Sequence, residues 1–243
     1  MNPPWWAETE TEANAIVKDF TSKLEEKLCE SPEKIIRRKN PFLFRVRAAS
    51  NVQTLADMVI NAYLSSSEET MFGHVLEDVV IAICKNAKNG RKSGIPNIDL
   101  EYDYGDTRTI MQIKSGVNWG NSSQHKAQAR AFKSATAVLR QGSRRLNVRC
   151  IEGICYGKSE IKDKGSHLRV VGHCFWEEIS DWDGTAGAVM ELLGKHASNG
   201  LNSAREEARD RMVCFLSDSG AVRDDDTVQW DKLLDLVMAD PRK

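Results

Sequence analysis

A hairpin signal near the middle of the chain constrains the fold most strongly. Two strand-like segments, 98–104 and 109–114, flank a Gly105-Asp106 pair that is compatible with a tight turn. The chain is therefore expected to contain an antiparallel strand pair.

The segments after this hairpin predict a helix and further strands. Residues 115–124 are polar and loop-like, and a cationic helix is expected from about 125 to 140. Residues 147–156 and 168–175 are strand-like, and a charged loop at 158–166 separates them. Strands and helices in this order predict a mixed α/β core.

Helical segments surround these strands. Apolar residues at three- and four-residue spacings predict amphipathic helices over 8–29 and 54–64. Overlapping Ser-x-x-Glu capping signals at 65–69 predict that a fresh helix starts there. Helices are also expected over 176–196 and around 202–216. The predicted class is α/β, with a central mixed sheet flanked by helices and additional N- and C-terminal helices.

The charged residues are segregated along the chain, although its formal net charge is only −1. Residues 107–151 hold nine Lys or Arg and no Asp or Glu, whereas 35 acids in 243 residues would place about six there. A second acid-free stretch, 34–56, carries six basic residues. Folded onto one face, the two stretches would form a positive surface suited to a polyanion. A solvated basic helix without a partner is the alternative.

The chain is expected to be soluble and not exported. No window approaches 18 uncharged apolar residues, and the acidic start MNPPWWAETETE lacks the basic and apolar regions of a signal peptide. The six cysteines include no CxxC pair, so buried free thiols in a reducing compartment are expected rather than a zinc ribbon. No phosphate-loop motif supports nucleotide-driven translocation.

The hairpin also carries residues suited to a divalent metal. Alternation along a strand places Gln112 and Lys114 on one side, and Asp99 and Glu101 likewise share a side. If the strands pair, Asp99 approaches Gln112 and Lys114, and a carboxylate with an amide oxygen suits Mg²⁺. The lysine would orient or help deprotonate an attacking water and offset charge on phosphorus. By spacing alone, an exposed hairpin with a lysine is the commoner explanation.

Five strings in the chain resemble a known enzyme family. The strings GRKSGIPNIDLEY, MQIKSGVNWGNSSQ, KNPFLFR, SSSEETMFGHVLED and CYGKS resemble type II restriction endonucleases of the PmeII/EcoO109I group, within the PD-(D/E)XK nuclease superfamily. The likeness covers roughly residues 38–196, and SGVNWGNSSQ is its most specific part. The resemblance implies the PD-(D/E)XK type of central sheet.

The resemblance implies a role for each matching residue. Asp99 corresponds to the metal-binding acid and Lys114 to the motif lysine. Gln112 stands where the superfamily more often has Asp or Glu, so it offers an oxygen but no charge. Glu77 is the candidate for a second carboxylate and metal ligand, with Glu69 and Glu101 as further candidates. A solvated helix face, or a cap for Glu69, is the alternative for the helical acids.

Residues near these positions are expected to contact DNA. Asn and Gln can pair with adenine, and Arg or Lys with guanine or phosphate. On the cationic helix, Lys133 lies near Lys126 and Arg130 at helical spacing. The predicted contacts come from the GRKSG loop, the polar loop and the cationic helix: Arg91, Lys92, Asn118, Trp119, Asn121, Ser122, Ser123, Gln124, Lys126 and Arg130. The alternative is a loop that only buttresses the site, with Trp119 packed in the core.

The prediction is a Mg²⁺-dependent type II restriction endonuclease that cuts both strands of a short double-stranded DNA site. Cutting a symmetric site calls for a homodimer. The family resemblance also implies a cognate DNA methyltransferase that forms no stable complex with this protein. The protein itself is expected in the bacterial cytoplasm. A DNA-binding protein with a degenerate, inactive nuclease site and a nuclease acting on structured or damaged DNA are the alternatives.

Three regions are expected along the chain. Residues 1–64 form an N-terminal helical region, a candidate for dimer or DNA contacts. Residues 65–200 form the catalytic and DNA-binding core, and 201–243 form a C-terminal helical region packed on it. The opening Trp5-Trp6 string is expected to be a docking arm or a disordered tip.

Overall fold

The computed structural model describes residues 2–142, 146–195 and 199–238. The chain divides into two compact units. One unit comprises Met1–Lys18 and Phe72–Ala197, and the other comprises Asp19–Met71 and Ser198–Lys243.

The first unit contains a mixed β-sheet. Its strands are β1 (Arg91–Lys92), β2 (Leu100–Tyr104), β3 (Thr107–Gly116), β4 (Asn147–Tyr156), β5 (Glu160–Asp163) and β6 (Leu168–Val171). Among the described residues, six strands form one sheet in the order β1-β2-β3-β4-β6-β5. The β3–β4 and β4–β6 pairs are parallel, and the other pairs are antiparallel. The predicted α/β class with a central mixed sheet is confirmed.

The predicted hairpin is β2 and β3. Leu100 lies opposite Met111, and the register continues to Tyr104 opposite Thr107. Gly105 follows at a φ of 57°, a backbone conformation that glycine adopts without steric cost. The turn therefore forms where the Gly-Asp pair predicted it.

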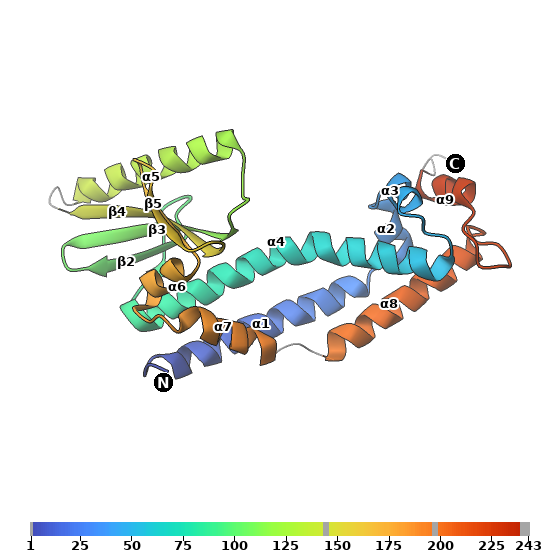
Figure 1. The fold of residues 1–243 in the computed structure, drawn as a ribbon, viewed down its shortest axis with the longest axis horizontal. Helices are drawn as coiled ribbons and strands as arrows, with labels where there is room; N and C mark the ends of the chain where they lie inside the picture. Colours follow the sequence, from blue (N-terminus) through green and yellow to red (C-terminus); the bar gives the residue numbers. More distant parts are fainter. Residues whose placement is uncertain (1, 143–145, 196–198, 239–243) are drawn as a thin grey trace. The chain divides into compact units, whose positions relative to one another are not determined.

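Helices cover both faces of this sheet, with α5 (Ser122–Gly142) on one face and α6 (His173–Ser180) on the other (Figure 1). On the α5 face, Phe132 and Ala135 pack with Ile110. On the α6 face, a Cβ added at Gly153 would lie 2.4 Å from the Phe175 ring, so this glycine lets the ring approach the strand. We call these two surfaces the α5 face and the α6 face.

One long helix replaces the two predicted over 54–83. Helix α4 (Val52–Lys88) runs without a break through the expected start at 65–69, so that prediction is wrong. The Ser66 hydroxyl lies 3.1 Å from the carbonyl oxygen of Ala62, one helical turn back. A serine that donates to its own helix does not act as a cap. The Ser-x-x-Glu pattern therefore predicted a helix start that does not occur.

The region after β4 also differs from the prediction. The charged loop at 158–166 contains β5, an exposed edge strand, and the strand predicted to 175 ends at Val171. The helix predicted over 176–196 is two helices, α6 and α7 (Thr185–Lys195). Asp181 ends α6 in a left-handed conformation with φ 54°, which breaks the helical ladder.

The N-terminal tryptophans pack inside the first unit. Helix α1 spans Trp6–Leu28, close to the predicted 8–29. The Trp5 and Trp6 rings meet the Trp182 ring edge-on, at centroid distances of 6.0 and 5.7 Å, and Trp6 is buried. The expected docking arm or disordered tip is therefore wrong, because these rings bury apolar surface against α6–α7.

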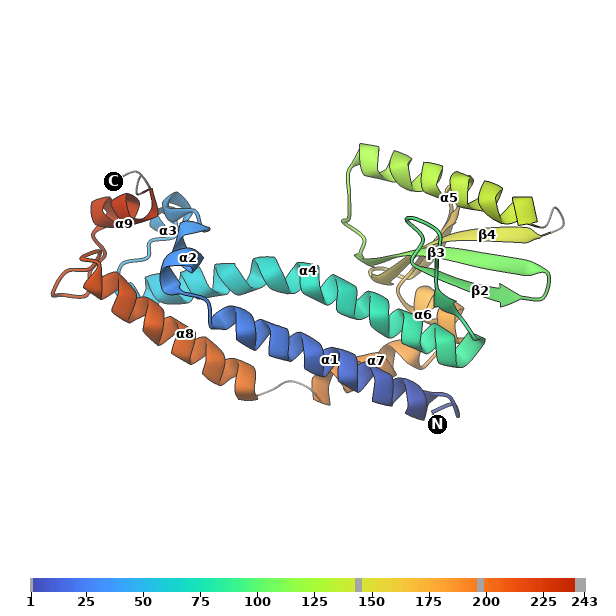
Figure 2. The same cartoon turned by 180° about the vertical axis from the view of Figure 1, so that it is seen from behind.

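The second unit is helical in its described residues (Figure 2). Besides parts of α1 and α4, it contains α2 (Pro32–Arg37), α3 (Pro41–Val46), α8 (Asn199–Asp218) and α9 (Trp230–Val237). Its core includes Phe44, Leu55, Met212 and Leu233. A helix was expected at 202–216, and α8 extends it at both ends. Across the described parts of the chain, no helix has the length and apolarity needed to cross a membrane.

Candidate functional site

Asp99 lies directly before β2 and continues its pairing with β3. Its backbone N–H donates to the carbonyl oxygen of Met111 at 2.9 Å. Its carboxylate Oδ2 accepts a hydrogen bond from the Ile113 N–H at 2.7 Å, so a side chain makes the next contact along β3. Ile113 lies between Gln112 and Lys114 in sequence, so the Asp99 carboxylate contacts β3 at the main-chain amide between these two residues.

Gln112 and Lys114 line a cavity on the α5 face. The cavity has a volume of about 470 Å³, and Trp119 and Gln128 also line it. Gln112 is buried and its Nε2 donates to the carbonyl oxygen of Asn97, which leaves the amide oxygen as the group that can ligate. Lys114 Nζ lies 5.1 Å from the Trp119 ring centroid and has no acidic partner among the described residues.

A buried carboxylate lies beside Gln112 on the neighbouring strand. Glu152 is directly in register with Gln112 across the parallel β3–β4 pair and is only 2% exposed. The Trp119 Nε1–H donates to Glu152 Oε1 at 2.7 Å, and His167 and Arg169 lie 3.5 and 3.8 Å from Oε2. A neutral amide at position 112 avoids a second carboxylate next to this buried charge.

These partners determine the ionisation of Glu152. Burial acts to raise the pKa of Glu152, but hydrogen bonds with His167 and Trp119 and the charge of Arg169 outweigh it. The pKa of Glu152 therefore lies below its ordinary value of 4.5, and the carboxylate is ionised at neutral pH.

Two of the three other candidate acids have cationic partners. Glu101 is buried, and its Oε1 pairs with Arg91 at 2.8 Å. Glu77 on α4 pairs with Lys92 at 3.3 Å. The GRKSG segment is thus not a free loop, because β1 aligns both of its cations with acids. Glu69 belongs to the other compact unit and is exposed.

The polar loop before α5 includes a helix cap. Asn121 Oδ1 accepts hydrogen bonds from the Ser123 N–H at 3.0 Å and the Gln124 N–H at 3.2 Å. Gln124 Oε1 accepts in return from the Asn121 N–H at 2.8 Å, which makes a reciprocal capping box. Asn118 and Ser122 are exposed beside this cap.

Helix α5 presents cations that lack acidic partners in the part of the chain that the structure describes. These exposed residues are Lys126, Arg130, Lys133 and Arg140. The last three line a groove of about 600 Å³. Two other cations of the same acid-free stretch are paired, since Arg108 contacts Asp103 at 2.7 Å and Arg149 contacts Glu178.

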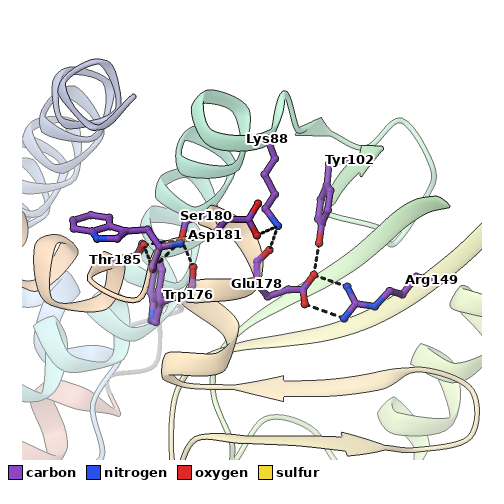
Figure 3. Close-up of polar contacts among 9 residues, drawn as sticks. Lys88, Tyr102, Arg149, Trp176, Glu178, Ser180, Asp181 and Thr185 are labelled. Carbon is purple, nitrogen blue, oxygen red and sulfur yellow. Dashed lines mark hydrogen bonds and ion pairs between the residues drawn. The ribbon is translucent and has the colours of Figure 1, made fainter. Parts of the chain in front are cut away.

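The α6 face carries a second polar network, which the sequence did not predict (Figure 3). Arg149 donates to Glu178 Oε2 at 2.9 Å, and the Tyr102 hydroxyl donates to Oε1. Lys88 Nζ donates to the Glu178 carbonyl oxygen at 2.7 Å and pairs with Asp181 at 2.8 Å. Burial acts to raise the pKa of Glu178, but hydrogen bonds from Arg149 and Tyr102 outweigh it, so the pKa is lowered.

The second acid-free stretch lies in the helical unit, and neighbouring acids pair with part of its charge. Arg37 contacts Glu33 at 2.9 Å, and Arg38 contacts Glu30 at 3.0 Å. These acids lie just outside the stretch in sequence, so an acid-free segment need not form a free positive surface.

Sequence reasoning missed Glu152 and Gln128. Glu152 is the one acid in the strand NVRCIEGICY, and a lone charge in an apolar strand is a usable signal for a buried partner. Gln128 lies on the buried side of α5, and its Nε2 has no hydrogen-bond partner among the described residues. Nothing in the local pattern separates it from a solvated glutamine.

The donor set around Asp99 fits a hard cation. Mg²⁺ is commonly held by one or two carboxylates and keeps several waters. Asp99 and the Gln112 amide oxygen provide such oxygens. In the described residues, no group of three or more His, Cys, Asp or Glu is arranged to hold a metal.

Comparison with known proteins gives the family. A search of curated proteins finds no significant match. The sequence model of the family described as "Type II restriction endonuclease EcoO109I" matches residues 12–200, more than three quarters of the chain. The described fold, an α/β unit with a mixed sheet, agrees with a nuclease of this kind, and the family implies binding to double-stranded DNA. The chain therefore belongs to the EcoO109I family of type II restriction endonucleases.

Proposed function

We propose that this protein hydrolyses phosphodiester bonds in both strands of a short, specific double-stranded DNA site in a Mg²⁺-dependent reaction. One observation carries the proposal: the Asp99 carboxylate is held by the Ile113 N–H between Gln112 and Lys114. This contact supports a site made of an acid, an amide and an amine, of which Gln112 and Lys114 line the cavity under α5.

Each residue has a chemical task in this proposal. Asp99 and Gln112 hold the metal, and Glu77 is the candidate for a further ligand once it separates from Lys92. The bound ion supplies charge neutralisation and an acidified water. Lys114 orients the attacking water and stabilises the charge that develops on the phosphate oxygens.

DNA binding is assigned to α5 and the loop before it. Lys126, Arg130 and Lys133 are exposed and have no acidic partner in the described part of the chain, so they suit phosphate contacts, which are the majority in protein–DNA interfaces. Asn118 and Ser122 are exposed and suit direct readout, with Asn121, Ser123 and Gln124 fixing the loop. Arg91 and Lys92 would join only if DNA displaced their acidic partners.

Cleavage of both strands of a symmetric site calls for two copies of the chain. We assign the twofold contact to the helical regions 1–64 and 201–243, on either side of the catalytic core at 65–200. A cognate methyltransferase would protect the host site. The DNA substrate and the free cysteines are consistent with a bacterial cytoplasm.

The direct test is digestion of plasmid DNA by the purified protein. Discrete fragments are expected with Mg²⁺ and none with EDTA, and sequencing of the fragment ends gives the site and cut position. Lys114→Ala is expected to bind the same site without cutting it, because it removes the amine assigned to catalysis and leaves the residues assigned to DNA contact in place. Cutting by Lys114→Ala at the wild-type rate contradicts the role of Lys114, and random fragment ends contradict site specificity.

A second candidate is a sequence-specific DNA-binding protein without cleavage. It is favoured by Gln112, which lacks the charge of an acid, and by the engagement of Glu77 and Glu101 with cations. A gel shift on one site, combined with no cleavage in Mg²⁺ or Mn²⁺, identifies this outcome.

A further inference from the structure

The Trp119 side chain is fixed on two sides next to the catalytic lysine. Its indole N–H donates to the buried Glu152 at 2.7 Å. The imidazole of His125, on the first turn of α5, meets the indole edge-on at a centroid distance of 4.6 Å. The ring is therefore held from β4 and from α5 at once.

Lys114 lies over the ring that these contacts fix. Its Nζ is 5.1 Å from the ring centroid, within the range of a cation–π interaction. A lysine side chain has four rotatable bonds and loses much freedom when it is held in one place. Among the described residues, no acid pairs with Lys114, so Trp119 is the observed constraint on its amine.

We infer that Trp119 is a positioning residue that holds the Lys114 amine at the reaction centre, and that Glu152 fixes Trp119. This inference rests on the proposed function for its catalytic consequence. A base-stacking role for Trp119 is disfavoured, because Lys114 lies over its ring and the hydrogen bond to Glu152 holds the ring in place. Glu152 acts through Trp119 and is not assigned to the metal.

The contact itself is tested without activity. Lysines are reductively methylated with carbon-13 formaldehyde and observed by NMR. The Lys114 signal is expected upfield of exposed lysines such as Lys162, because the indole ring current shields it. In Trp119→Leu the signal should return to the position of exposed lysines. An unshifted wild-type signal, or a shift that survives in Trp119→Leu, overturns the inference.

The catalytic consequence is tested by single-turnover cleavage at saturating protein. Trp119→Leu is expected to slow cleavage by about tenfold to a hundredfold, as for a misplaced catalytic group. Trp119→Phe keeps a ring, so its cleavage rate should fall less. Glu152→Gln keeps an acceptor for the indole N–H, and its cleavage rate should lie between those of Trp119→Leu and Trp119→Phe. Lys162→Ala, an exposed residue of β5, serves as the matched control and should cut normally.

DNA affinity separates positioning from DNA contact. Measured in Ca²⁺, the dissociation constant of Trp119→Leu should stay within about twofold of wild type. A tenfold weaker affinity with an unchanged saturated cleavage rate overturns the inference in favour of a DNA contact. If Trp119→Leu does not fold, Trp119→Phe and Glu152→Gln carry both measurements. Wild-type protein that cuts no DNA overturns the proposed function, whereas the NMR shift still decides whether Trp119 holds Lys114.

Discussion

The cavities on the two faces of the sheet differ in the partners of the cations that line them, although the same strands supply both faces. On the α6 face, Arg149 and Tyr102 both reach Glu178, and Lys88 completes the network (Figure 3). On the α5 face, Lys114 lacks an acid and Gln128 Nε2 lacks a partner among the described residues. Removing one partner of a desolvated pair leaves an unpaired charge and destabilises the fold, whereas groups left unpaired near a cavity are available to a ligand.

The comparison predicts that variants on the α5 face lose activity and variants on the α6 face lose stability. The largest expected effect is on the α5 face. Asp99→Asn keeps an oxygen for the Ile113 N–H but removes the charge, so cleavage should fall by about a thousandfold with unchanged thermal unfolding. Initial rates on a plasmid and a melting curve measure both quantities. A large loss of stability with normal cutting would erase the distinction between the faces.

A smaller effect is expected on the α6 face. Glu178→Ala leaves Arg149 and Tyr102 without their acceptor and should lower the free energy of unfolding by about 2 kcal/mol. This is less than for a fully buried pair, because the Arg149 side chain is 35% exposed. Urea unfolding measures the change, and cleavage by the folded protein should be normal. The exposed neighbour Glu177→Ala is the control and should match wild type.

Acid titration sharpens the same prediction. The folded-state pKa of Glu178 is lowered below its ordinary 4.5, so its stabilisation is present above that value and is lost as the pH falls through the folded-state pKa. Glu178→Gln should therefore lose less stability than wild type when both are acidified below about pH 4.5. Parallel pH curves for the two proteins would contradict the assigned pKa shift.

The smallest expected effect concerns the two acid-free stretches. Replacing Arg130 and Lys133 with Ala should weaken DNA binding about tenfold and reduce the slope of log affinity against log salt by about two. The matched double variant of Lys34 and Arg37 should bind within about twofold of wild type, since Arg37 already pairs with Glu33. Binding titrations at several salt concentrations test both. Equal losses in the two variants would show that pairing by nearby acids does not matter.

Local pattern was enough to predict β2, β3 and β4, but not the edge strands β1 and β5 or the ends of several helices. Strand β4 spans the predicted 147–156, because apolar β-branched residues and flanking polar segments define a buried strand. The serines of α4 give the same sequence signal whether they cap a helix or donate a hydrogen bond within one. The conformation of the preceding turn decides which of the two forms.

The candidate site was predictable in part for the same reason. The position of Asp99 beside β3 follows from strand alternation and a hairpin, both of which are local. The β3–β4 register brings Glu152 beside Gln112, and this register depends on where the chain rejoins the sheet after α5. The spacing of residues within one segment therefore does not predict that Glu152 lies opposite Gln112.

The contact between Asp99 and the Ile113 N–H has a consequence for variation in this enzyme. A main-chain amide is the same whatever side chains flank it, so the acid is anchored by a group that substitution on β3 does not alter. The residue at 112 can therefore exchange a carboxylate for an amide without displacing Asp99. The anchor separates the placement of Asp99 from the chemical identity of the residue at position 112.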